Sequence, residues 1–180
     1  MRIVVSGNSI PLQVYPRAND NRTFCQILGD EYEVIVTCDI KKTIRQAEAI
    51  NDVICFYPDY TILCYGIVEC YPLSFGKARM DKSKFRYYTE MLIKTIRVMC
   101  DSKIIILGIL PVNSYWENKR SHLKNNVYSY NKILNEIAAE YACQFIDLSD
   151  FKEEVKPQGF HLNQEGHIKL AERIDFELQE

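Results

Sequence analysis

The sequence lacks any hydrophobic run long enough to form a helix that spans a bilayer. Near the N-terminus the longest apolar run is Ile3–Val5, which is too short for the core of a secretory signal. We therefore expect a cytoplasmic protein. The sequence also lacks a large excess of either charge, because the 180 residues carry a net charge of only −2. This balance gives no general reason to expect nucleic acid or a membrane surface as a partner.

Motifs that bind metals or nucleotides are missing as well. The chain has seven cysteines, an odd number, and no two of them are spaced as C-x-x-C. Free thiols are the expected state, rather than a disulfide framework or a zinc site. Neither G-x-G-x-x-G nor G-x-x-x-x-G-K-[ST] occurs. We expect no cofactor and no metal.

What the chain does contain is an alternation of short apolar runs with amphipathic stretches. Apolar runs rich in β-branched residues indicate buried strands, and apolar residues spaced three or four apart indicate helices. The predicted strands are Ile3–Val5, Tyr32–Cys38, Tyr60–Tyr65, Lys103–Leu110 and Gln144–Leu148. The predicted helices are Phe24–Leu28, Lys42–Phe56, Lys84–Cys100, Val127–Ala142 and Gln164–Leu178.

This alternation predicts an α/β fold, a three-layer α/β/α sandwich around a five-stranded, mostly parallel sheet. We expect the flavodoxin-like strand order 2-1-3-4-5 and a single domain over residues 1–180, since no linker or repeat is visible. Three long connections follow strands: 67–83, 111–126 and 149–163. In such sheets the ligand crevice lies beyond the carboxyl ends of the strands. The long loops and the crevice should therefore coincide.

Two residues near this predicted crevice suit acyl-transfer chemistry. Ser9 follows the first strand, and Gly7 just before it allows a sharp turn that presents a hydroxyl. His161 lies just before the last helix and is the natural proton acceptor for a serine hydroxyl. Taken singly, Ser9 is better explained as a helix N-cap and His161 as a surface-loop histidine.

Together these segments resemble the SGNH (GDSL-type) hydrolase family over nearly the whole chain. The run 7–10 (GNSI) is similar to the family's block around the nucleophile, and 158–163 (QGFHLN) to its block around the histidine. The run 66–69 (GIVE) stands where the family has G-x-N-D. The resemblance implies Ser9 as nucleophile and His161 as base, with Asn8 and Gly66 close to the substrate.

The chain departs from the family pattern at several positions. The aspartate usually found three residues before the histidine is Gln158, and the usual oxyanion-hole asparagine corresponds to Val68. Losses of this kind are large in serine hydrolases, about 10⁴-fold for the orienting acid and roughly 10²–10³-fold for one oxyanion donor. Lys41 and Glu69 are candidate substitutes. The Lys41 ammonium could replace a donor or select an anionic substrate, and Glu69, expected to end strand three, could bind a substrate hydroxyl or hold His161.

These residues lead to one functional hypothesis and two alternatives. The leading hypothesis is a serine-dependent esterase that removes small acyl groups, such as acetyl, from a sugar or similar small molecule. The first alternative is a binding module that has lost catalysis, which Gln158 and Val68 motivate. The second is acyl transfer by the same serine–histidine pair.

Overall fold

The computed structural model describes residues 1–8, 22–73, 76–120, 122–152, 154 and 161–179. Five strands form one sheet in the order β2-β1-β3-β4-β5, and all four strand pairings are parallel. This confirms the predicted α/β fold and its strand order. The strands are β1 (Arg2–Gly7), β2 (Glu33–Val36), β3 (Tyr60–Cys64), β4 (Lys103–Leu107) and β5 (Gln144–Ile146).

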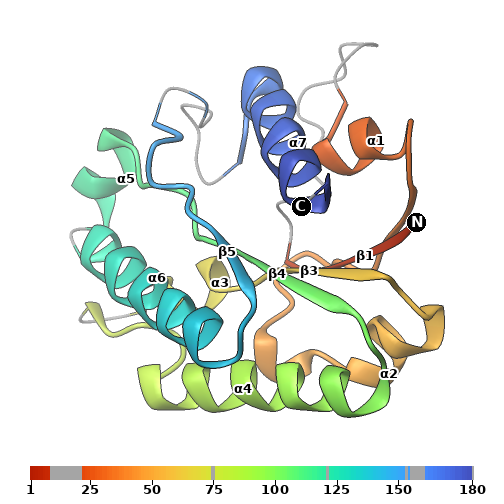
Figure 1. Ribbon diagram of the computed structural model, residues 1–180. Helices are drawn as coiled ribbons and strands as arrows, with labels where there is room; N and C mark the ends of the chain where they lie inside the picture. Colours follow the sequence, from red (N-terminus) through yellow and green to blue (C-terminus); the bar gives the residue numbers. More distant parts are fainter. Residues whose placement is uncertain (9–21, 74–75, 121, 153, 155–160, 180) are drawn as a thin grey trace.

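Helices cover both faces of the sheet (Figure 1). On one face lie α1 (Phe24–Leu28) and α7 (Gln164–Gln179), and on the other lie α4 (Lys82–Met99) and α6 (Leu123–Glu140). The shorter helices are η2 (Ile44–Gln46), α2 (Ala49–Asp52), η3 (Ile54–Phe56), α3 (Ile67–Cys70) and α5 (Ser114–Lys119). No helix in the described part of the chain is long and apolar enough to cross a membrane.

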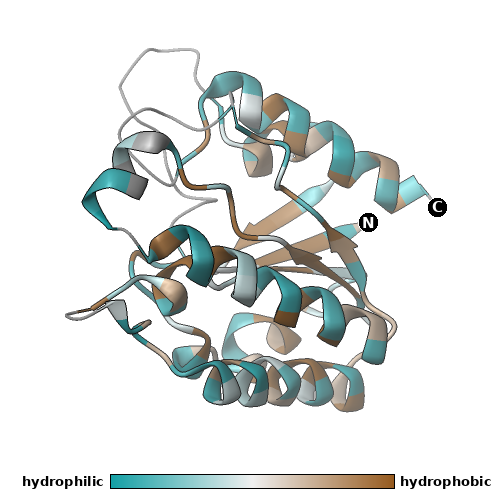
Figure 2. Ribbon diagram, turned by 90° about the vertical axis from the view of Figure 1, so that its left-hand side faces the viewer, coloured by the Kyte–Doolittle hydropathy of each residue, from teal (hydrophilic) through white to brown (hydrophobic). Residues whose placement is uncertain are grey.

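The sheet divides the apolar interior into two cores, one on each face. Because successive side chains of a strand point to opposite faces, Ile3 and Val5 pack with α1 and α7, while Val4 packs with α4 and α6. Apolar residues therefore run continuously along the strands, as the brown colour of the sheet in Figure 2 shows. The outward faces of the helices are mainly hydrophilic in the same view.

The predicted helix over 42–56 is wrong. This segment forms three short pieces, η2, α2 and η3, because local contacts interrupt the helical hydrogen bonds. Asp52 accepts the backbone N–H of Glu48 with its side chain, and Val53 has φ −136° and ψ −62°. Polar side chains that bond nearby backbone groups compete with helix formation in this way. The connections 67–83 and 111–126, predicted as loops, contain α3 and α5.

Candidate active site

A cavity of about 250 Å³ opens beyond the carboxyl end of the sheet. It brings together three positions that the sequence placed at the crevice: Lys41 after β2, Val68 in α3 and His161 before α7. The remaining lining residues are Ile40, Ile67, Tyr71 and Arg79. Segments that follow β2, β3 and β5 therefore meet at one small site, as expected for the crevice of a parallel sheet.

The start of α7 holds His161 at this cavity. Asn163, two residues later, accepts the backbone N–H of Gly166 at 2.8 Å and caps the helix. The backbone N–H of Asn163 donates to the carbonyl of Glu154 at 2.7 Å, and Leu162 is fully buried. The second histidine of the motif, His167, is buried in α7 and accepts the backbone N–H of Phe24 through Nδ1. His167 thus binds α7 to α1, whereas His161 is partly exposed and lines the cavity.

The predicted nucleophile, Ser9, lies outside the described residues, as does Gln158. The residue before Ser9 is well defined, because the backbone N–H of Asn8 donates to the carbonyl of Cys64 at 3.0 Å. A Cβ on Gly7 would lie 2.4 Å from that same carbonyl oxygen, so only glycine fits there. β1 therefore delivers the chain to Ser9 from the middle of the sheet, between β2 and β3.

Asn8 itself is fully buried, and its side-chain amide has no hydrogen-bond partner among the described residues. A buried amide without a partner is unfavourable by about 1–3 kcal/mol. Asn8 is therefore a polar group held next to the predicted nucleophile with its bonding capacity unused within the described structure. Its contact with substrate stays a prediction.

Glu69 has a different place from the one predicted. β3 ends at Cys64, and Glu69 lies in α3 with no exposed surface. One carboxylate oxygen accepts the backbone N–H of Ile44, and the other accepts that of Gly66 at 2.9 Å. Burial raises the pKa of the Glu69 carboxyl, although these N–H donors and the charge of Arg79 act in the opposite direction. In the described structure Glu69 joins the connection after β2 to the start of α3. Its contact with substrate or with His161 stays a prediction.

Gly66 is required to be glycine by its own backbone and packing. Its φ of +126° lies in a region that favours glycine, and a Cβ there would lie 2.5 Å from Cδ1 of Ile109. Its N–H is donated to Glu69. The approach of a substrate to Gly66 stays a prediction.

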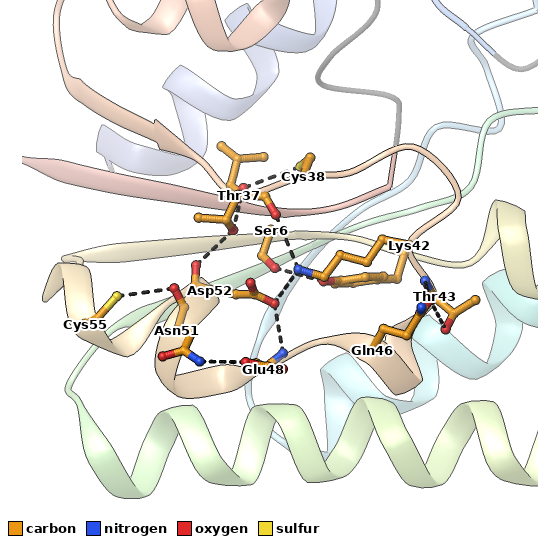
Figure 3. A network of polar contacts seen from close by, with 12 residues as sticks. Ser6, Thr37, Cys38, Lys42, Thr43, Gln46, Glu48, Asn51, Asp52 and Cys55 are labelled. Carbon is orange, nitrogen blue, oxygen red and sulfur yellow. Dashed lines mark hydrogen bonds and ion pairs between the residues drawn. The ribbon is translucent and has the colours of Figure 1, made fainter.

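Lys41 lines the cavity and belongs to the connection after β2. The backbone of Lys41 has φ +66°, and the next residue, Lys42, turns its side chain toward Asp52 and forms an ion pair with it at 2.5 Å (Figure 3). The side chains of this pair are only 14% and 15% exposed, so water screens the pair weakly. The backbone N–H of Asp39 donates to the carbonyl of Gly7 at 3.2 Å, which ties the connection to β1.

Sequence reasoning missed Arg79 as a lining residue. Arg79 belongs to the long connection after β3, and its backbone N–H donates to the carbonyl of Tyr71 at 2.9 Å. The available signal was its position, because that connection follows a strand and so runs along the crevice edge. In the described part of the chain, no cluster of three or more His, Cys, Asp or Glu residues is suited to hold a metal ion.

Comparison with known proteins adds to this geometry. The sequence profile of the family described as GDSL-like lipase/acylhydrolase matches residues 37–174, a range that contains Val68 and His161 but begins after Ser9. No match was found among curated proteins.

Several solved structures share the fold. The acetyl xylan esterase AlAXEase superposes with a TM-score of 0.77 at 19% identity, covering 97% of this chain and 98% of that chain. The lipase/acylhydrolase from Enterococcus faecalis gives 0.76 at 20% identity, with 99% and 95% covered. Axe2, an acetylxylan esterase from Geobacillus stearothermophilus, gives 0.72 at 17% identity, with 96% and 91% covered.

Proposed function

Since this chain belongs to the GDSL-like lipase/acylhydrolase family and is an enzyme of the esterase type, we propose that it is a serine-dependent hydrolase of small acyl esters. The favoured substrates are acetyl esters of a carbohydrate or of a similar small molecule. One observation carries the proposal. His161 lines a small cavity at the carboxyl edge of the sheet, the edge toward which β1 leads Ser9. Solved structures with this fold include acetyl xylan esterases.

In the proposed reaction Ser9 attacks the ester carbonyl while His161 accepts the serine proton. The tetrahedral intermediate collapses, the bond from carbon to the alcohol oxygen breaks, and His161 returns the proton to that oxygen. Water then attacks the acyl-serine with His161 again as base, which releases the carboxylic acid and restores Ser9. The backbone N–H of Ser9 supplies one donor to the oxyanion.

The size of the cavity favours a short acyl group. Its volume of about 250 Å³ lies below the roughly 300–1,000 Å³ typical of pockets for drug-sized ligands. Ile67 and Val68 offer apolar surface to such a group. We therefore expect acetyl to butyryl esters to be better substrates than esters of long fatty acids.

The test is labelling with a fluorophosphonate probe, combined with turnover of 4-nitrophenyl acetate. Wild type should be labelled and active, whereas Ser9→Ala should lose both properties and His161→Asn should lose at least about 10²-fold in kcat. Ser129→Ala is a matched control, because Ser129 is a partly exposed serine on α6 whose hydroxyl donates to the carbonyl of Asn125. Equal, slow turnover by wild type and Ser9→Ala, with neither labelled, would reject the proposal.

Two further measurements, of thermal stability and of transfer products, separate the two alternatives. Val68 brings no hydrogen-bond donor to the cavity, which is the observation that favours a catalytically impaired binding module. In that case an acetylated sugar raises the melting temperature of the wild type and is not turned over. If acyl transfer dominates, adding a sugar acceptor yields acylated acceptor in place of free acetate.

A further inference from the structure

Among the described residues that line the cavity, the charged side chains of the basic and acidic types are all of one sign. Lys41 and Arg79 belong to this lining, and no described carboxylate does. Neither cation has an ion-pair partner within the described ranges. The carboxyl of Glu69 interacts electrostatically with Arg79, but both of its oxygens are buried and bonded to backbone N–H groups. The described part of the cavity therefore presents two cations that form no ion pair with a described residue.

A third cation lies beside the lining. Arg120, after α5, donates from Nε to the hydroxyl of Tyr71 at 3.3 Å, and its guanidinium carbon lies 5.7 Å from the centre of that ring. Tyr71 lines the cavity and also bonds the backbone of Arg79. The connections after β3 and β4 thus bring Arg79 and Arg120 to the same tyrosine.

Both lining cations are carried by constrained backbone. Lys41 has a left-handed backbone conformation. It lies between Asp39, whose N–H donates to the carbonyl of Gly7 in β1, and Lys42, whose ion pair with Asp52 is shown in Figure 3. Arg79 is fixed by its bond to Tyr71, and the next residue, Met80, donates its N–H to the carbonyl of Glu69. Cations held close together repel each other, and an anion bound between them removes that repulsion.

We propose that the ester cleaved in this cavity carries a negative charge close to the scissile bond, a carboxylate or phosphate on its alcohol or its acyl part. This inference rests on the proposed function for its kinetic test. Lys41 and Arg79 are its specificity-determining residues. The ester carbonyl lies toward His161 and the apolar wall of Ile67 and Val68, while the anionic group lies toward the two cations. Histidine and lysine therefore serve different parts of one substrate.

Matched ester pairs test the proposal on each side of the scissile bond. For the alcohol side, 4-acetoxybenzoate is compared with 4-acetoxybenzamide, which has the same acyl group and nearly the same shape but no charge. For the acyl side, mono(4-nitrophenyl) adipate is compared with 4-nitrophenyl hexanoate. Wild type should prefer the anionic member of at least one pair by about five- to tenfold in kcat/KM, since exposed charge pairs of this kind are each worth roughly two- to fivefold.

Variants assign the preference to the named side chains. Lys41→Met and Arg79→Met should each lower the anionic-to-neutral ratio by about two- to fivefold, and the double variant should abolish the preference. Lys103→Met is the control for lost charge, because Lys103 begins β4 at the opposite end of the sheet. Raising the salt from 20 to 500 mM should lower the ratio in wild type and change it little in the double variant.

Binding to the inactive protein keeps this test separate from that of the catalytic proposal. With Ser9→Ala, 4-hydroxybenzoate should raise the melting temperature more than 4-hydroxybenzamide does, and Lys41→Met should remove the difference. Ratios near one in both ester pairs, or a ratio that Lys41→Met and Arg79→Met leave unchanged, would overturn the inference. If no ester is turned over at all, the proposed function fails, and the binding comparison alone decides whether the cavity selects anions.

Discussion

The Glu69 carboxyl lies at the start of α3 with both oxygens bonded to backbone N–H groups from two different connections. Glu69→Gln keeps the shape but turns an amide N–H₂ toward one of those donors. We expect the free energy of unfolding to fall by about 1–3 kcal/mol, because one buried N–H loses its acceptor. Urea denaturation measures this change, with 4-nitrophenyl acetate turnover recorded alongside.

Turnover should fall in the same variant, because Ile44 and Gly66 position the walls of the cavity. Glu48→Gln is the control, since Glu48 is an exposed acid whose carboxylate accepts the amide of Asn51. If Glu69→Gln has the stability of wild type, the carboxylate does not hold the two connections together, and its role has to be sought elsewhere.

The seven cysteines are all free, as expected from their spacing, but they differ in accessibility. Burial raises the pKa of the thiols of Cys25, Cys64 and Cys70, which keeps them protonated and unreactive. Cys55 is exposed on η3. We predict that a maleimide modifies Cys55 first in the native protein, as read by peptide mass spectrometry. Rapid labelling that persists in Cys55→Ser would contradict this.

At the scale of secondary-structure elements, one ion pair stabilises the connection after β2. Asp52, at the end of α2, accepts from Nζ of Lys42 and from the backbone N–H of Glu48 at 2.8 Å (Figure 3). Lys42→Met leaves a poorly hydrated carboxylate without its cation, so we expect a loss of about 1–3 kcal/mol in unfolding free energy. Glu33→Gln, which removes the exposed Arg2–Glu33 pair, should change stability by less than about 1 kcal/mol.

Since this connection carries Lys41, the Lys42→Met variant should also raise KM for the anionic esters. Equal stability effects of Lys42→Met and Glu33→Gln in urea denaturation would show that the pair contributes no more than an exposed one.

Elements with a continuous or periodic apolar pattern could be predicted from the sequence. Phe24–Leu28 is the observed α1, and all five strands were found, most of them with ends one to three residues too long. The apolar residues of these elements meet partners wherever the fold places them, so local pattern suffices. The segment 42–56 could not be predicted from its apolar spacing, because the side chain of Asp52 binds the backbone N–H of Glu48, and Glu69, 25 residues from Ile44, accepts the N–H of Ile44.

The candidate site could likewise be predicted only in part from the sequence. The meeting of Lys41, Val68 and His161 follows from strand order, since each lies in the connection that follows β2, β3 or β5. The burial of Glu69 and the lining role of Arg79 depend on how the connection after β3 folds back, with Arg79 and Met80 bonding Tyr71 and Glu69. No local pattern encodes that return. The role of Ser9 stays a prediction from its motif.

At the scale of the whole molecule, a cluster of charges joins the chain after β5 to α7. Arg173 donates to both carboxylate oxygens of Asp150, and Lys169 lies 2.6 Å from Glu154. Both cations also lie over the ring of Phe151, at 4.5 and 4.8 Å from its centre. This cluster holds the first part of the connection that leads to His161 against α7, so its titration should affect stability and activity together.

The pKa of Asp150 is lowered mainly by its hydrogen bond from Arg173, and that of Glu154 by its hydrogen bond from Lys169. A carboxylate with a lower pKa in the folded state stabilises the fold above its unfolded pKa, about 4, and loses this contribution as the pH falls through the folded value. Glu69, whose pKa is raised, has the opposite sign and offsets part of the loss. Stability should therefore fall below about pH 4.

We expect Asp150→Asn to be less stable than wild type by about 0.5–1 kcal/mol at pH 7, because the pair is half exposed and screened by water. That difference should shrink as the pH falls below the unfolded pKa of about 4, because the lowered pKa of folded Asp150 makes protonation favour the unfolded chain. Urea denaturation at pH 7, 5 and 3 measures it, with Asp101→Asn as an exposed control whose effect stays small throughout. A difference that is constant across this range would mean that Asp150 contributes through packing or neutral hydrogen bonds, and the acid sensitivity would then have to arise from other carboxylates.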